Sequence, residues 1–257
     1  MPQNLSFQLY SARNHQPWTD IIPMLAKAGY TDVEGFGGAY GNPGAFYDEP
    51  EKFRALLDQN NLRMSSGHFF PLEMFTKDMK RVINIAKVLG MRDLYCPFVM
   101  ADQRKNSSAF WKSFGKKLAE VNNHVRGEGL GFGWHNHDFE FAELSDGSLP
   151  IDWIFDAAPS IDWEMDVAWI VRAKKNPVKW IKAYKDRITS VHVKDIAVKG
   201  KNLDQDGWCN VGEGVVKWPE IFKALQGGRV MHYVMEHDNP KDVKSFAQKS
   251  AKFCKKF

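Results

Sequence analysis

The sequence predicts an α/β fold in which a single domain, residues 1–257, forms a (β/α)8 TIM barrel. Eight segments that suit strands each precede a segment with helical spacing, and this alternation predicts parallel strands connected by helices. The length of 257 residues is close to the roughly 250 typical of such a barrel. Most predicted strands also end in a charged or imidazole side chain, at the end where these barrels hold their active sites.

The first half of the chain supplies four strand and helix units. Residues 5–10 alternate apolar and polar side chains, and residues 17–28 repeat apolar side chains at helical spacing until Gly29 ends the helix. Gly90 and Gly127 end two later helices in the same way. The other predicted strands are 31–35, 62–67 and 93–97, the helices are 50–59, 77–89 and 107–126, and a glycine-rich loop covers 35–44.

The second half supplies four more units. Strand 131–137 precedes a short helix, 151–158, which Pro159 terminates. The remaining strands are 161–166, 189–194 and 230–236, the helices are 177–184, 218–225 and 242–255, and a long polar loop covers 195–214. A doubly wound sheet is disfavoured because no G-x-G-x-x-G segment follows an early strand.

Composition argues against several classes of partner. The 35 Lys and Arg residues exceed the 31 Asp and Glu residues by only four, and most are dispersed along the chain. The basic run at 249–256 suits a solvated helix face better than a nucleic-acid footprint. No apolar run approaches the roughly 18 residues of a membrane span, and the first residues lack a secretion signal. We therefore expect a cytoplasmic protein with neither a nucleic-acid nor a membrane partner.

Four predicted strands place polar side chains on one face and bulky apolar side chains on the other. In the stretch Gly131-Phe132-Gly133-Trp134-His135-Asn136-His137, the alternation of a strand puts His135 and His137 on one face and Trp134 on the opposite one. The strands that end at Asp166, His192 and Glu236 repeat this pattern. If these strands lie side by side, their polar ends meet at one mouth of the barrel.

Those ends predict a metal site formed by His135, Asp166, His192 and Glu236. Two imidazoles and two carboxylates form a mixed nitrogen and oxygen set that suits Mn, Co, Zn, Ni or Fe, whereas Mg prefers more oxygen. The donor set alone does not select among these divalent ions.

Each polar residue also has a structural interpretation. A strand-end imidazole such as His68 is as compatible with a hydrogen-bonded structural role as with a functional one. Glu34 is equally compatible with a role in capping the next loop or in pairing with an arginine. Asp166 suits the N-cap of a following helix. Glu164, deeper in its strand, is expected to be the buried partner of a lysine, and His232 to be a barrel-core residue.

Several segments at the strand ends together resemble a known family. They are Val33-Glu34-Gly35, Trp134-His135-Asn136-His137-Asp138-Phe139-Glu140-Phe141, Met165-Asp166-Val167, His192-Val193-Lys194-Asp195, Gly212-Glu213-Gly214, Trp218-Pro219 and Met235-Glu236-His237-Asp238. Over nearly the whole chain, the sequence resembles the sugar phosphate isomerase/epimerase family, which has a xylose-isomerase-like barrel.

The resemblance implies a divalent metal ion (Mn, Co, Zn, Ni, Fe or Mg) held by Glu, Asp, His and Glu from the last four strands. Asp166, His192 and Glu236 match the last three positions, but His135 stands where a Glu is usual. In the better-known epimerases that Glu is one of two acid/base carboxylates. The departure leaves Glu236 with a different catalytic partner, such as His137 or Glu34.

The implied reaction is abstraction of a proton next to a carbonyl, through an enediolate that the metal stabilises. Return of the proton to the neighbouring carbon or to the same carbon gives an isomerase or an epimerase, and loss of a β-leaving group gives a lyase or dehydratase. Lys194 is a candidate to bind a substrate oxygen or the enediolate.

The substrate is expected to be a small sugar or keto-sugar. His68 and the aromatic residues Phe36, Trp134 and Trp169 are predicted to contact it, and the sequence shows no phosphate-binding loop or arginine cluster at a helix start. Two other classes stay open: a non-catalytic sugar-binding subunit, and a nuclease resembling endonuclease IV, for which the strand-end imidazoles are too few. A homo-oligomer is compatible with the sequence.

Overall fold

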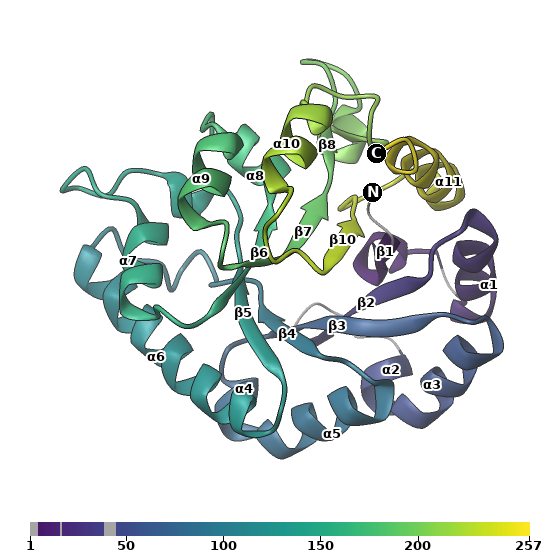
Figure 1. The fold of residues 1–257 in the computed structure, drawn as a ribbon, viewed down its shortest axis with the longest axis horizontal. Helices are drawn as coiled ribbons and strands as arrows, with labels where there is room; N and C mark the ends of the chain where they lie inside the picture. The colour runs from purple at the N-terminus through teal and green to yellow at the C-terminus, as the bar shows by residue number, and fades with distance from the viewer. Residues whose placement is uncertain (1–4, 16, 39–44) are drawn as a thin grey trace.

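The protein forms a closed barrel of eight parallel strands surrounded by helices (Figure 1), which confirms the predicted fold. The computed structural model describes residues 5–15, 17–38 and 45–257. The barrel strands are β1 (Leu5–Gln8), β2 (Asp32–Gly38), β3 (Arg63–Phe70), β4 (Asp93–Cys96), β5 (Gly131–His135), β6 (Asp162–Asp166), β7 (Ile188–Val193) and β10 (His232–Met235). Each strand pairs with the next in chain order, and β1 pairs with β10 to close the barrel.

Helices follow the strands and cover the outside of the barrel (Figure 1). They are α1 (Trp18–Ala28), α2 (Ala45–Asp48), α3 (Pro50–Gln59), α4 (Met74–Lys77), α5 (Met79–Leu89), α6 (Ser108–Gly127), α7 (Pro150–Ala157), α8 (Val167–Arg172), α9 (Pro177–Tyr184), α10 (Trp218–Leu225) and α11 (Val243–Cys254). Short 3-10 helices lie at η1 (Leu9–Ala12), η2 (Phe139–Phe141) and η3 (Leu203–Gln205). Among the residues described, no helix is both long and apolar enough to cross a membrane.

The structure adds short elements that the sequence patterns did not predict. The helices α2, α4 and α8 have four to six residues, too few for a clear helical period. The predicted polar loop 195–214 contains an antiparallel pair, β8 (Asp195–Ile196) and β9 (Trp208–Cys209). Strand β2 extends to Gly38, so the predicted glycine-rich loop begins inside a strand, and positions 39–44 lie outside the described residues.

Apolar side chains fill the layer between strands and helices, whereas much of the barrel interior is polar. Trp134 and Phe114 of α6 pack edge to face with ring centroids 5.2 Å apart in the outer layer. Inside the barrel, Nε2 of His232 lies 2.9 Å from Oδ2 of Asp93, so His232 is a barrel-core residue as predicted. There is no room for a side chain at Gly133, because a Cβ there would lie 2.6 Å from the Asp162 carbonyl oxygen. This interior places buried polar groups directly beneath the strand ends.

Candidate active site at the barrel mouth

A cavity of about 420 Å³ opens at the carboxyl ends of the strands. This volume falls within the range of small-molecule sites. Its lining combines aromatic rings with acid/base groups: Tyr10, Phe36, His68, Phe70, Pro97, Phe98, Met100, His135, His137, Trp169, Glu236 and Asp238. A groove of about 470 Å³ on the outer surface, lined by residues of α4, α5 and α6, contains none of the predicted site residues.

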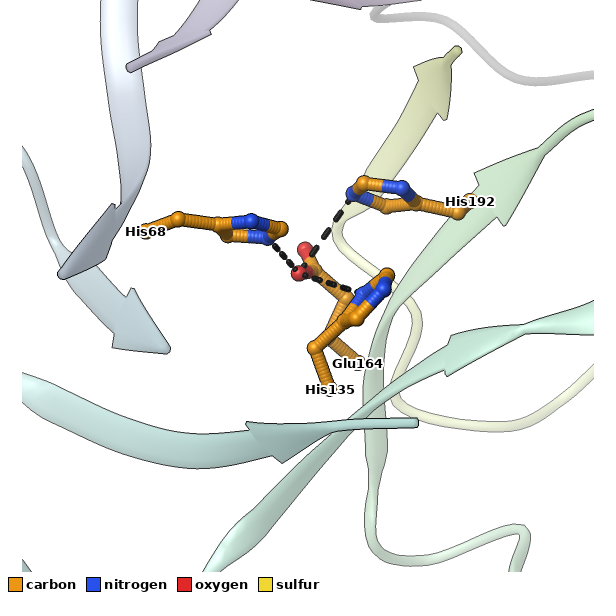
Figure 2. Close-up of side chains that lie close together, drawn as sticks. All are labelled: His68, His135, Glu164 and His192. Carbon is orange, nitrogen blue, oxygen red and sulfur yellow. Dashed lines mark hydrogen bonds and ion pairs between the residues drawn. The ribbon is translucent and has the colours of Figure 1, made fainter. Parts of the chain in front are cut away.

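The first buried group beneath this cavity is formed by His68, His135, Glu164 and His192, which we call the three-histidine cluster (Figure 2). Three imidazole nitrogens converge on one carboxylate oxygen, Oε2 of Glu164. Nδ1 of His135 lies 3.2 Å from it, Nε2 of His192 lies 3.4 Å from it, and Nε2 of His68 is in hydrogen-bond contact with it. Glu164 was predicted to pair with a lysine. That prediction was wrong, because Glu164 points into the barrel, where imidazoles from β3, β5 and β7 surround it.

Glu34 supports this cluster from β2. Its Oε1 accepts a hydrogen bond from Nε2 of Gln8 at 2.8 Å and lies 2.8 Å from Nε2 of His192, and its Oε2 accepts one from the Ser66 hydroxyl at 2.5 Å. Glu34 neither caps a loop nor pairs with an arginine in these contacts. It is fully buried and is not among the residues that line the cavity.

Burial and charge together set the protonation of the three-histidine cluster. Burial opposes protonation of His68, but the carboxylates of Glu34 and Glu164 outweigh it and raise the pKa of His68 to about 9. Burial and the Glu34 charge favour a protonated Glu164, yet His192 and His68 lower the pKa of Glu164 to about 2. His135 differs, because burial and the neighbouring His192 lower its pKa well below the ordinary value. Charge attraction thus favours the protonated forms of His68 and His192 beside these carboxylates, whereas burial favours the neutral form of His135.

The second buried group, which we call the carboxylate set, consists of Asp166, His192 and Glu236. Nδ1 of His192 lies 3.0 Å from Oε2 of Glu236. Asp166 is both an N-cap and a member of this set: its Oδ1 accepts the Trp169 backbone N–H at 3.0 Å, whereas its Oδ2 is buried and has no hydrogen-bond partner among the described residues. Burial raises the pKa of Asp166 to about 7, against the opposing effect of Lys194 and His192.

The structure thus divides the four predicted metal ligands. Asp166, His192 and Glu236 come together, but His135 joins the three-histidine cluster. His192 belongs to both groups because its two ring nitrogens face different ways: Nε2 faces Glu34 and Glu164, and Nδ1 faces Glu236.

Lys194 connects the carboxylate set to a residue that the sequence analysis missed, Asp238. Its Nζ donates to Oδ1 of Asp238 at 2.5 Å and to Oε2 of Glu236 at 3.2 Å, and it lies 3.9 Å from Oδ2 of Asp166. Burial alone would lower the pKa of Lys194, but Asp238, Glu236 and Asp166 outweigh it and raise that pKa. The sequence does contain a signal for Asp238. It lies two residues after Glu236, so both side chains fall on one face of an extended segment.

His137 lies against an aromatic wall of the cavity. Its ring stacks on Phe139 with centroids 5.8 Å apart, and the rings of Phe98 and Trp169 lie 5.0 and 5.1 Å away. Its Nδ1 is buried and has no hydrogen-bond partner within the described chain. Burial and the charge of Lys194 lower the pKa of His137 well below its ordinary value. A neutral imidazole with an unpaired nitrogen therefore borders the cavity.

Two further residues that were not singled out hold the 135–140 segment in place. Oδ1 of Asn136 accepts hydrogen bonds from the Asp166 backbone N–H at 3.0 Å and from Nε1 of Trp163 at 2.9 Å, and its Nδ2 donates to the Asp166 carbonyl at 3.1 Å. Glu140 accepts the His137 backbone N–H at 2.9 Å and Nε1 of Trp134 at 2.8 Å. Asn136 thus fixes the end of β6, where Asp166 lies.

The predicted substrate-contacting residues fall into two groups. Phe36, His68 and Trp169 line the cavity. Trp134 does not, because its side chain lies on the outer face of β5 against α6, with its Nε1 bonded to Glu140. The assignment of Trp134 to the substrate conflicts with this position. The alternation along the strand already placed its side chain opposite His135.

Comparisons with known proteins agree with this architecture. A family model described as "Xylose isomerase-like TIM barrel" matches residues 22–257. A sugar phosphate isomerase/epimerase from Parabacteroides distasonis ATCC 8503 is 23% identical with a TM-score of 0.81, and the match covers 98% of this chain and 96% of that one. No curated protein matches the sequence.

Two other solved structures share the fold. A probable 3-DHS dehydratase, AsbF, from Bacillus anthracis is 14% identical with a TM-score of 0.77, and the match covers 98% of this chain and 99% of that one. An IolI protein with a bound zinc atom is 14% identical with a TM-score of 0.78, and coverage is 99% and 96%. The predicted resemblance is confirmed: the family match over residues 22–257 shows that this chain belongs to the xylose isomerase-like TIM barrel family.

Proposed function

We propose that this protein is a metal-dependent isomerase or epimerase that moves a proton next to the carbonyl of an unphosphorylated sugar or keto-sugar. One observation carries the proposal: Glu236 and His137 border the same cavity from different sides of the barrel, next to a buried carboxylate set. Strands β5 and β10, which these residues follow, are separated by β6 and β7. Two acid/base groups can therefore reach one substrate from different directions.

The carboxylate set fits a divalent metal ion. Asp166 Oδ2 is a buried oxygen without a hydrogen-bond partner among the described residues, and such an atom is costly unless a cation or donor satisfies it. Three protein donors from Asp166, His192 and Glu236 also follow the pattern of catalytic sites, which leave one position open. When bound, the ion would supply positive charge that favours loss of a proton next to the substrate carbonyl.

The proton-transfer roles follow from position. His137 borders the cavity, and its imidazole would accept or return the substrate proton. Glu236 is the member of the carboxylate set that lines the cavity, and its carboxylate would act on the other side of the substrate. Lys194 is not among the lining residues. Its ammonium instead holds Glu236 and Asp238 in place, so we assign it a positioning role.

The lining suits a sugar ring. Phe36, Phe70, Phe98 and Trp169 offer apolar surface for the carbon face of a sugar, and Tyr10 and Asp238 bring polar groups to the same cavity. Among the described residues that line the cavity there is no arginine or lysine, which favours a substrate without a phosphate group.

A lyase or dehydratase reaction on a keto-sugar is the second candidate. Asp238 lines the cavity beside Glu236, and burial raises the pKa of Asp238 against the opposing effect of Lys194. A carboxyl group whose pKa is raised is better suited to protonate a departing hydroxyl or alkoxide after proton abstraction. Fold similarity to a probable 3-DHS dehydratase is compatible with this reaction.

Exchange of substrate protons with D2O tests the proposal. The metal-loaded protein is incubated with a panel of ketoses and 3-keto-sugars, and proton NMR follows deuterium incorporation and product formation. We expect exchange next to the carbonyl, and a loss of about 100-fold or more in Glu236→Gln and in His137→Gln. His124→Gln, an exposed histidine on α6, is the matched control.

A new stereoisomer or ketose-aldose pair indicates an epimerase or isomerase, and an unsaturated product indicates the lyase. Binding of a sugar without any exchange would contradict both reactions and support a sugar-binding subunit.

A further inference from the structure

We infer that the three-histidine cluster is a metal centre of its own, with zinc as the ion that its donors suit best. Its four members come from β3, β5, β6 and β7, and their donor atoms lie within 4.8 Å of one another. All four residues are buried. Figure 2 shows the imidazoles of His68, His135 and His192 turned toward the carboxylate of Glu164.

The spacing of two pairs of donor atoms matches a tetrahedral ion. Zinc binds nitrogen and oxygen at about 2.0–2.2 Å, so neighbouring donors of a tetrahedron lie about 3.3 Å apart. Nδ1 of His135 lies 3.2 Å and Nε2 of His192 lies 3.4 Å from Oε2 of Glu164. Two of the six donor-to-donor spacings of the required tetrahedron are thus present, whereas Nε2 of His68 is in direct hydrogen-bond contact with Oε2.

His135 supplies independent evidence for a missing ligand. Its Nδ1 is buried and lies 3.2 Å from Oε2 of Glu164, but this contact lacks the geometry of a good hydrogen bond. Such a short distance without a good hydrogen bond is expected when the nitrogen and the oxygen both point toward a cation between them. A buried nitrogen without a partner is otherwise costly. A cation between the donors would remove this cost.

Outer contacts orient the donors as they do in known metal sites. The Ser190 hydroxyl donates to Oε1 of Glu164 at 2.7 Å, which leaves Oε2 toward the imidazoles. The other ring nitrogen of His192, Nδ1, lies 3.0 Å from Oε2 of Glu236, so each metal group would use a different nitrogen of this imidazole.

The inferred centre differs in chemistry from the carboxylate set. Its four protein donors complete a tetrahedral shell, whereas the carboxylate set offers three and leaves a position open. Three nitrogens and one oxygen favour Zn, Co, Ni or Cu over Mg or Ca, and a filled d-shell makes Zn the best match to a tetrahedral set. His192 is common to both groups, because its Nε2 faces Glu164 and its Nδ1 faces Glu236. This inference does not rest on the proposed reaction, because metal content is measured without substrate.

Metal analysis of the full chain tests the inference. Chelator-stripped protein is dialysed against Zn²⁺, and bound zinc is measured by elemental analysis in the wild type, His68→Gln, His135→Gln and Asp166→Asn. We expect Asp166→Asn to retain zinc, and the two histidine variants to lose the zinc of this cluster, with affinity falling about 100-fold or more. His232→Gln, a buried barrel histidine outside both groups, controls for general loss of structure.

X-ray absorption spectroscopy on Asp166→Asn keeps the test decisive if a histidine variant fails to fold. Three imidazoles in the zinc shell would support the cluster. A shell with one imidazole or none, or zinc that disappears in Asp166→Asn but persists in both His68→Gln and His135→Gln, would overturn it. Failure of sugar exchange with this zinc still bound would contradict only the proposed reaction.

Discussion

Substitution of Asn136 by alanine should be one of the most destabilising single changes at the mouth of the barrel. The residue is fully buried, and its amide makes hydrogen bonds to the Asp166 backbone N–H, the Asp166 carbonyl and Nε1 of Trp163, all between 2.9 and 3.1 Å. Alanine leaves these three partners buried without a replacement. At about 1 kcal/mol for each bond, plus part of the cost of orphaned buried groups, we expect a loss of about 3–4 kcal/mol.

The matched control is Asn122→Ala. Asn122 is also buried, but among the described residues its amide bonds only to the side chains of Ser160 and Arg126, both of which are exposed and can turn to water. We expect a loss of about 1 kcal/mol there. Urea unfolding followed by circular dichroism gives both values from the transition midpoints.

A functional consequence accompanies the loss of stability. Because Asn136 clamps the backbone of Asp166, the alanine variant should also bind metal at the carboxylate set more weakly, by about 10-fold or more. Equal destabilisation by Asn136→Ala and Asn122→Ala, with metal affinity unchanged, would refute the view that Asn136 positions Asp166.

Two further predictions concern stability. Burial, opposed by hydrogen bonds from backbone and indole donors, raises the pKa of Glu140 to about 8. The folded state then binds more protons than the unfolded state between about pH 4.5 and 8, so stability should fall as pH rises through this window, by at most about 1.4 kcal/mol per pH unit, and Glu140→Gln should flatten that slope. Urea midpoints at several pH values check this, and an unchanged slope in the variant would contradict it. Gly133→Ala should cost about 1–3 kcal/mol, because the added Cβ would lie 2.6 Å from the Asp162 carbonyl oxygen and 2.9 Å from Cδ1 of Tyr95, whereas Gly127→Ala meets nothing within 4 Å and should cost little in the same unfolding assay.

The sequence by itself determined the barrel and the end of it that carries polar chemistry. Alternation of strand and helix patterns was sufficient for the fold, because each pattern depends on local periodicity, and the helices at 50–59, 177–184 and 218–225 coincide with α3, α9 and α10. The same local alternation separated the face of His135 from that of Trp134. Short helices such as α8 were not predicted, because six residues contain too little of the helical period.

Only the tertiary structure decided how the polar side chains group. Strand alternation shows which face a residue occupies, but not which residues from other strands lie opposite it across the barrel, since that depends on strand stagger and closure. Glu164 therefore looked like a partner for a lysine, whereas closure of the barrel surrounds it with His68, His135 and His192. For the same reason, the residues of one predicted metal site fall into two adjacent groups, and each group contacts a different ring nitrogen of His192.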